Sequence, residues 1–220
     1  MSIYDKASLV LIPSGTKTSK VYSQKPTNGD GDFTFSRSTA ATRVNASGNI
    51  EKETQNLLLQ SNSFDISANW TNSNTSETGG QSGYNGTNDA WKLTALSTGS
   101  GRRIQQGISY SGVNTFSIYA KAGNLNWVAV TSPSVGAYFD LANGVVGASI
   151  GTIIDSNIED AGSGWYRCSF TANVSWTEIQ IYIASANSSV SVSSGDYIYI
   201  QDAQLEQGLV ARDYIETTTT

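Results

Sequence analysis

Segments of alternating polarity follow one another from residue 89 onward, and they constrain the fold more than any other feature of the chain. Most of them are separated by Gly, Asn or Ser. Short strands at such regular spacing indicate a β-sandwich or barrel, and we expect no helix of about ten residues here. The segments are DAWKLTAL (89–96), RRIQQG (102–107), VNTFSIYAK (113–121), NWVAVTS (126–132), GAYFDLA (136–142), GTIIDSNIEDAG (151–162), WYRCSFTANV (165–174), TEIQIYIAS (177–185) and DYIYIQDAQLE (196–206).

The alternation predicts which side chains form the core, because successive residues of a strand point to opposite faces of the sheet. Each large apolar side chain that becomes buried contributes roughly 1.5–3 kcal/mol, so a set of this size can build one core. Charged residues make up only 14% of the chain, which also disfavours long helices. The predicted inward-facing residues are Phe116, Ile118, Cys168, Phe170, Ala172, Val174, Ile179, Ile181, Ile183, Ile198 and Ile200.

The first quarter of the chain differs from the rest in charge and in pattern. Residues 1–55 contain seven Lys or Arg and five Asp or Glu, a net charge of +2, whereas residues 56–220 contain six and thirteen, a net charge of −7. Too few apolar side chains are present in residues 1–55 for a core of their own, so we predict an extended N-terminal β-arm ordered by contacts with something else. Its extended pieces are predicted at 8–13, 19–23, 32–37 and 42–44.

The sequence permits only general predictions for two segments between the arm and the alternating region. NLLLQSNSF (56–64) fits one helical turn or a buried strand, and periodicity cannot decide over so short a stretch. Residues 72–88 are rich in Gly, Asn and Ser, which predicts an exposed polar loop.

Composition argues against several functional classes. The net charge of −5 disfavours nucleic acid as a partner, and no apolar run is long enough for a transmembrane helix. The chain has no histidine, so a Ser-His-Asp triad or a Cys-His pair cannot form, and we expect no enzyme. Glycosidase chemistry needs only two carboxylates, but the candidates lie in or beside predicted turns. They are Asp140, Asp155, Glu159, Asp160 and Glu178.

The stretch LVLIPSGTKTSKVYSQKPTNGDGDFTFSRSTAATRVNASGNIE (9–51) resembles the N-terminal block of a family of tailed-bacteriophage virion proteins. NLLLQSNSFD, NTFSIYAKAG, GWYRCSFT and YIYIQDAQLEQGLVARDYIETT resemble the jelly-roll domain of phage head-fibre and tail-fibre proteins, which is similar to carbohydrate-binding modules. Together the two resemblances cover nearly the whole chain. They imply an all-β protein in which a jelly-roll β-sandwich (56–220) follows the arm (1–55).

The resemblance also implies a function and partners. We expect a virion structural protein of the capsid decoration or head-fibre type, assembled in the cytoplasm of the host bacterium. The arm would bind other virion proteins or intertwine with sister subunits, by analogy in a homotrimer, or it would add edge strands to its own sandwich. The jelly roll would display a face for cell-surface polysaccharide. The alternatives are a tail-fibre or receptor-binding component, a cement protein without a ligand, and a polysaccharide depolymerase, which is disfavoured because most candidate carboxylates lie in or beside predicted turns.

Sugar-binding modules present aromatic rings on a solvent-facing sheet, where the rings stack on the CH face of a sugar. By alternation, the candidates for glycan binding are Tyr119, Trp127, Tyr138, Arg167 and Tyr182, although outward-facing aromatics also pack under loops or at subunit contacts. Jelly rolls of this type often hold a structural calcium near the last strand, where Asp202 matches the acidic position. An ordinary hydrogen bond is the alternative role of Asp202. The single cysteine, Cys168, is expected to fill a core position.

Overall fold

A computed structural model of the chain describes residues 6–17, 20–28, 30, 32–34, 42–44, 50–52 and 55–218. The chain divides into two compact units, Met1–Glu53 and Thr54–Thr220. Residues 55–218 contain no helix, and their regular secondary structure consists of β-strands. No helix in the described part of the chain is long and apolar enough to cross a membrane.

The described part of the first unit consists of short antiparallel ladders. Asp32 supports one of them, because its carboxylate accepts hydrogen bonds from the backbone N–H and the hydroxyl of Ser23, at 2.7 and 3.1 Å. These strands overlap the extended pieces that the sequence predicts, although residue 19 of the expected segment 19–23 and residues 35–37 of 32–37 lie outside the described residues. One ladder joins β1 (Val10–Lys17), β2 (Lys20–Lys25) and β3 (Phe33–Thr34), and another joins β4 (Thr42–Val44) to β5 (Ile50–Lys52).

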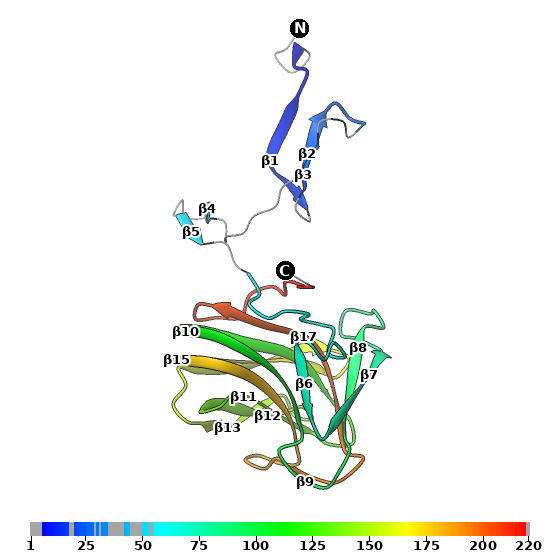
Figure 1. The fold of residues 1–220 in the computed structure, drawn as a ribbon, viewed down its shortest axis with the longest axis vertical. Helices are drawn as coiled ribbons and strands as arrows, with labels where there is room; N and C mark the ends of the chain where they lie inside the picture. Colours follow the sequence, from blue (N-terminus) through cyan, green and yellow to red (C-terminus); the bar gives the residue numbers. More distant parts are fainter. Residues whose placement is uncertain are drawn as a thin grey trace. The chain divides into compact units, whose positions relative to one another are not determined.

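The second unit is a β-sandwich of the jelly-roll type, as the sequence predicts. Its main ladder runs through ten antiparallel strands (Figure 1), and β9 (Gly99–Ser100) and β16 (Ser191–Val192) form a small separate pair. The ten strands are β6 (Trp70–Ser73), β7 (Thr75–Gln81), β8 (Ala90–Ala95), β10 (Arg103–Ala122), β11 (Trp127–Ser132), β12 (Val135–Asp140), β13 (Val145–Ile150), β14 (Asp155–Gly162), β15 (Trp165–Ala184) and β17 (Tyr197–Gln207).

The two longest strands, β10 and β15, belong to both layers of the sandwich. Their register shifts between Gly107 and Tyr110, and a bulge of this kind bends a strand. Before the bend, β10 pairs with β6 and with the second half of β15, which continues to β11. After the bend, β10 pairs with β17 and with the first half of β15, which continues to β14. We therefore call β13-β12-β11-β15-β10-β6 layer A and β14-β15-β10-β17-β8-β7 layer B.

One core lies between the layers, and it contains the side chains that alternation predicts. Of the predicted inward-facing residues, all but Val174 are at most 1% exposed, and Val174 packs against the same core while partly buried. Trp70, Trp165 and Trp176 are among the largest buried side chains. Burial raises the pKa of the Cys168 thiol, which keeps this core residue protonated and unreactive.

The structure differs from the sequence-based expectations in several places, of which three concern whole segments. Residues 75–81 of the predicted polar loop form the edge strand β7, whose ladder with β8 tolerates polar side chains because an edge is open to water. Residues 56–64 form neither a helix nor a strand but a turn-rich segment that buries Leu58 and Phe64. Strand β13 was not predicted, because its side chains are mostly half-buried and do not alternate clearly.

Candidate functional site

The outer face of layer A carries a cluster of aromatic and aliphatic side chains away from the core. Ala129 of β11 lies between Tyr138 of β12 and Tyr182 of β15 in one cross-strand row. Trp127 neighbours this row, and a Cβ at Gly147 would lie 2.7 Å from its ring, so β13 passes directly against Trp127. Burial raises the pKa of the hydroxyls of both tyrosines, so they stay protonated as hydrogen-bonding groups.

A chain of hydrogen bonds continues from this cluster across layer A. Gln180 is central to it: its side-chain oxygen accepts from the hydroxyls of Thr131 at 2.9 Å and Tyr182 at 3.0 Å. The Gln180 amide donates to Glu178 at 2.6 Å, and Gln105 donates to the other oxygen of Glu178 at 3.1 Å.

Arg103 closes this chain of hydrogen bonds. Its Nε donates to Gln105 at 2.6 Å, and its guanidinium lies 5.3 Å from the centre of the Tyr182 ring. The polar side chains of this face therefore hold one another in fixed positions, which lowers the entropy cost of binding a ligand.

The cluster and the hydrogen-bonded residues border a groove of about 370 Å³. Tyr138, Tyr182, Thr131 and Gln180 form its sheet side together with Ala129. Such a groove, with ring faces beside fixed amide and hydroxyl groups, suits a small polar ligand with apolar faces. The remaining lining residues are Ser100, Gly101, Pro133, Ile150 and Val190.

The structure does not bring all predicted glycan-binding residues together. Trp127, Tyr138 and Tyr182 share the outer face of layer A, whereas Tyr119 and Arg167 lie opposite each other on the outer face of layer B. The ring of Tyr84 stacks on Tyr119 with centroids 3.7 Å apart and planes 5° apart, so one face of the Tyr119 ring is already covered. The binding role of each of the five residues stays a prediction.

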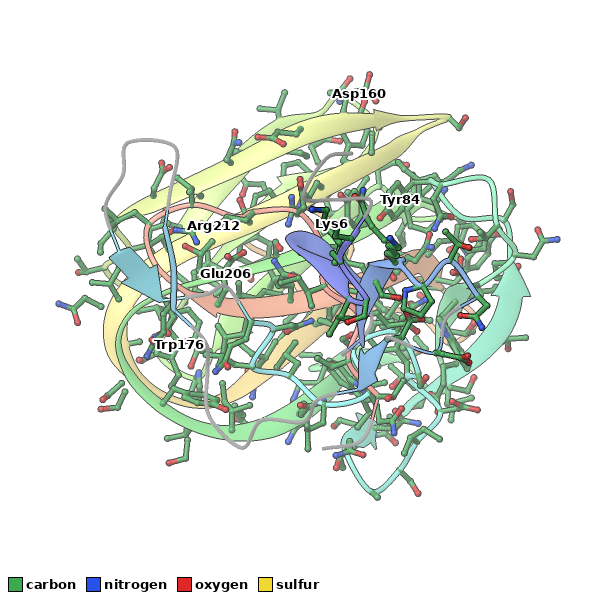
Figure 2. All side chains as sticks on the ribbon, turned by 90° about the horizontal axis from the view of Figure 1, so that it is seen from above. Lys6, Tyr84, Asp160, Trp176, Glu206 and Arg212 are labelled. Carbon is green, nitrogen blue, oxygen red and sulfur yellow. The ribbon has the colours of Figure 1, made fainter. Side chains whose placement is uncertain are left out.

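The C-terminal segment 208–218 covers polar side chains of layer B. Gln204 donates to the carbonyls of Arg212 and Asp213 and accepts from the N–H of Ile215 at 2.8 Å. Glu206 accepts from the N–H of Arg212 at 2.9 Å, and both residues are labelled in Figure 2. Arg167 donates to the Arg212 carbonyl. These groups of layer B therefore bind the protein's own C-terminal segment.

Asp202, the predicted calcium ligand, lies in a bulge of β17 with a φ of +54° and is 4% exposed. Its carboxylate accepts a hydrogen bond from the Tyr84 hydroxyl at 2.9 Å (Tyr84 is labelled in Figure 2), and its N–H donates to Asn62. Burial, with a smaller contribution from Asp89, raises the pKa of Asp202 to about 6.

The surroundings of Asp202 bear on the calcium prediction. Within the described residues, no three His, Cys, Asp or Glu side chains gather as metal ligands. The hydrogen bonds of Asp202 to Tyr84 and Asn62 fit a hydrogen-bonded carboxyl group better than a calcium ion, which prefers six or more oxygen ligands. Calcium at Asp202 stays a prediction from the resemblance.

The candidate carboxylates for catalysis lie in different parts of the sandwich. Asp140 accepts hydrogen bonds from the N–H groups of Ala142 and Asn143 in the turn after β12. Asp160 accepts from the N–H of Gly162, and Asp155 and Glu159 are exposed on β14, where both border a pocket of about 100 Å³ with Arg167. Glu178 belongs to the hydrogen-bonded chain of layer A.

Sequence reasoning missed several residues that border the groove. The alternation places Gln180 on the outer face, as it does Tyr182. The residues around Gln180 in the sequence do not indicate that it binds Thr131, which lies on another strand. Ile150 and Val190 lie on an unpredicted strand and in the turn before β16, and only the folded chain brings them to the groove.

Comparisons with solved structures give distant matches, two of which are described below. No protein-family model and no curated protein matches the chain. The CBM22-1–GH10 modules of Clostridium thermocellum endo-1,4-beta-D-xylanase 10B, complexed with xylohexaose, match with a TM-score of 0.40 and 11% identity, over 74% of this chain and 29% of that one. The enzymatically active domain of bacteriophage CBA120 tailspike protein 4 matches with a TM-score of 0.40 and 18% identity, over 70% and 21%. The chain thus spans less than a third of either structure, and likeness at this level says nothing about a shared ligand or activity.

Proposed function

We propose that the chain is a bacteriophage virion structural protein whose jelly roll binds cell-surface glycans through the groove of layer A. The observation that carries the binding proposal is the arrangement around Ala129. Two tyrosine rings flank this small residue, and the fixed side chains of Thr131 and Gln180 lie beside it. Rings suit the CH face of a sugar, and fixed amide and hydroxyl groups suit its hydroxyls.

The virion part of the proposal rests on the N-terminal block. Residues 9–51 resemble the corresponding block of tailed-phage virion proteins, and their net positive charge contrasts with the acidic remainder of the chain. The arm would attach the protein to a capsid, where many weakly binding copies act together and raise avidity. We propose binding without catalysis, because the candidate carboxylates serve turns, an exposed strand or the hydrogen-bonded chain.

A glycan array of bacterial surface polysaccharides tests the binding proposal. The labelled full chain should bind at least one glycan, and Tyr182→Ala should abolish that binding because it removes one ring wall of the groove. The control is Tyr119→Ala, which alters the stacked pair on layer B and should bind like the wild type. Circular dichroism checks that both variants fold. No binding by the wild type would contradict the proposal and favour a cement protein.

A second experiment tests the arm. Deletion of residues 1–55 should abolish attachment to particles that lack this protein, because the arm provides the virion contacts. Undiminished attachment of the shortened protein would refute the anchoring role.

A further inference from the structure

The groove of layer A has two unlike sides, and these restrict the sugar that it can hold. Gln180 and Tyr182 provide polar groups on the sheet side, and Thr131 lies next to Gln180 in register. Ile150 and Val190 border the same groove, and both pack on the outer cluster as partly buried aliphatic side chains.

The lining also argues for a neutral ligand. Among the described residues that line the groove, none has a charged side chain. Arg103 and Glu178 lie nearby, but each is engaged with Gln105. A carboxylate or phosphate on the sugar would therefore lose its water without gaining a cation in the groove.

The sheet side of the groove is low beside Thr131. Ala129 lies between the two tyrosines in register and is itself fully buried, and the next row has Gly136 beside Thr131. Gly136 cannot be larger, since a Cβ there would lie 2.3 Å from the Val130 carbonyl oxygen. Ile150 of β13 is the cross-strand partner of Gly136, so an aliphatic side chain stands next to this glycine on the neighbouring strand.

An aliphatic wall distinguishes a methyl group from a hydroxymethyl group. A hydroxyl that meets only Ile150 and Val190 loses its hydrogen bonds to water without replacement, which is unfavourable. A methyl group in the same place gains from burial. In a common hexose carbon 6 is the carbon of a hydroxymethyl group, whereas in a 6-deoxyhexose it is the carbon of a methyl group.

We propose that the groove is selective for a neutral 6-deoxyhexose in a surface polysaccharide. The sugar ring lies in the groove against Tyr138 and Tyr182, its methyl group contacts Ile150 and Val190, and its hydroxyls bind Gln180 and Tyr182. This inference rests on the proposed glycan binding and adds the class of sugar.

Matched pairs of methyl glycosides test this selectivity with the full chain. Methyl α-L-rhamnopyranoside is compared with methyl α-L-mannopyranoside, and methyl α-L-fucopyranoside with methyl α-L-galactopyranoside, by titration followed in NMR spectra. The members of each pair differ only at carbon 6. We expect the deoxy member of at least one pair to bind about three to ten times more tightly, the usual range for one buried methyl group. Saturation transfer should be strongest at its carbon-6 methyl protons.

Val190→Thr is the informative variant, because it keeps the shape of the side chain and replaces a methyl group by a hydroxyl. In this variant, the ratio of the dissociation constants of the hydroxymethyl and the deoxy sugar should fall to less than half of its wild-type value, while the protein stays folded. Val145→Thr makes the same change at a position of β13 that is 53% exposed and outside the groove, and it should leave the preference unchanged.

The outcomes separate this inference from the proposed function. Equal binding within both pairs, tighter binding of the hydroxymethyl sugars, or array hits confined to N-acetylated or acidic sugars would overturn the 6-deoxyhexose assignment and leave glycan binding intact. An array without any hit would remove both.

Discussion

Asp202→Asn should change how the stability of this protein depends on pH. The carboxyl group of Asp202 is almost fully buried in the β17 bulge, and burial raises its pKa from 3.8 to about 6. The folded state therefore binds a proton at Asp202 more tightly than the unfolded state does. The stabilisation from this proton is fully present below pH 3.8 and is lost as the pH rises through 6. At about 1.4 kcal/mol for each pKa unit, the loss amounts to about 3 kcal/mol.

Asparagine is a suitable replacement at this position. It tolerates the positive φ of residue 202 better than most residues, and its side-chain oxygen can still accept a hydrogen bond from Tyr84. Because asparagine does not titrate, the variant should lack the loss of stability between pH 4 and pH 7. The difference in the free energy of unfolding, variant minus wild type, should thus rise by about 2.4 kcal/mol over this range.

Urea denaturation followed by tryptophan fluorescence at pH 4, 5, 6 and 7 measures this difference. Asp155→Asn, at an exposed position of β14, controls for the change in net charge. A difference that does not vary with pH would refute the reasoning, as would one that falls toward neutral pH.

Three further predictions concern the core, the C-terminal segment and calcium. Ile181→Ala should lower the free energy of unfolding by about 2–5 kcal/mol, whereas Val145→Ala should change it by less than about 0.5 kcal/mol; similar values for both would contradict the assigned core. Gln204→Ala should speed hydrogen exchange at the Ile215 amide, and unchanged exchange would show that this bond does not hold the segment. Calcium added to chelator-treated protein should leave the Tm unchanged if Asp202 only accepts hydrogen bonds, whereas a rise that Asp202→Asn abolishes would establish a calcium site.

The alternation of polarity predicts most of the core, because a strand buried on one face must repeat with a period of two. It therefore places Ile179, Ile181 and Ile183 correctly, and it puts Tyr182 on the outer face. The alternation cannot show that 102–107 and 113–121 belong to one strand, since a bulge bends that strand without interrupting its ladder. It also misses β13, whose side chains are mostly half-buried.

The candidate site is harder to predict, because it depends on which layer each outer face belongs to. Tyr119 and Tyr182 look alike in the sequence, since both alternate with buried isoleucine or alanine. They lie on different layers because β10 and β15 cross from one layer to the other between these positions. Tyr84, which covers Tyr119, comes from a loop whose sequence contains no sign of that contact.

Mapping a bound glycan onto the protein tests the central claim most directly. In amide and side-chain NMR spectra, titration with the best-binding oligosaccharide should shift the signals of Thr131, Gln180 and Tyr182 on layer A and leave those of Tyr119 and Arg167 unchanged. Shifts that gather around Tyr119 and Arg167 instead, with none on the outer face of layer A, would contradict the account.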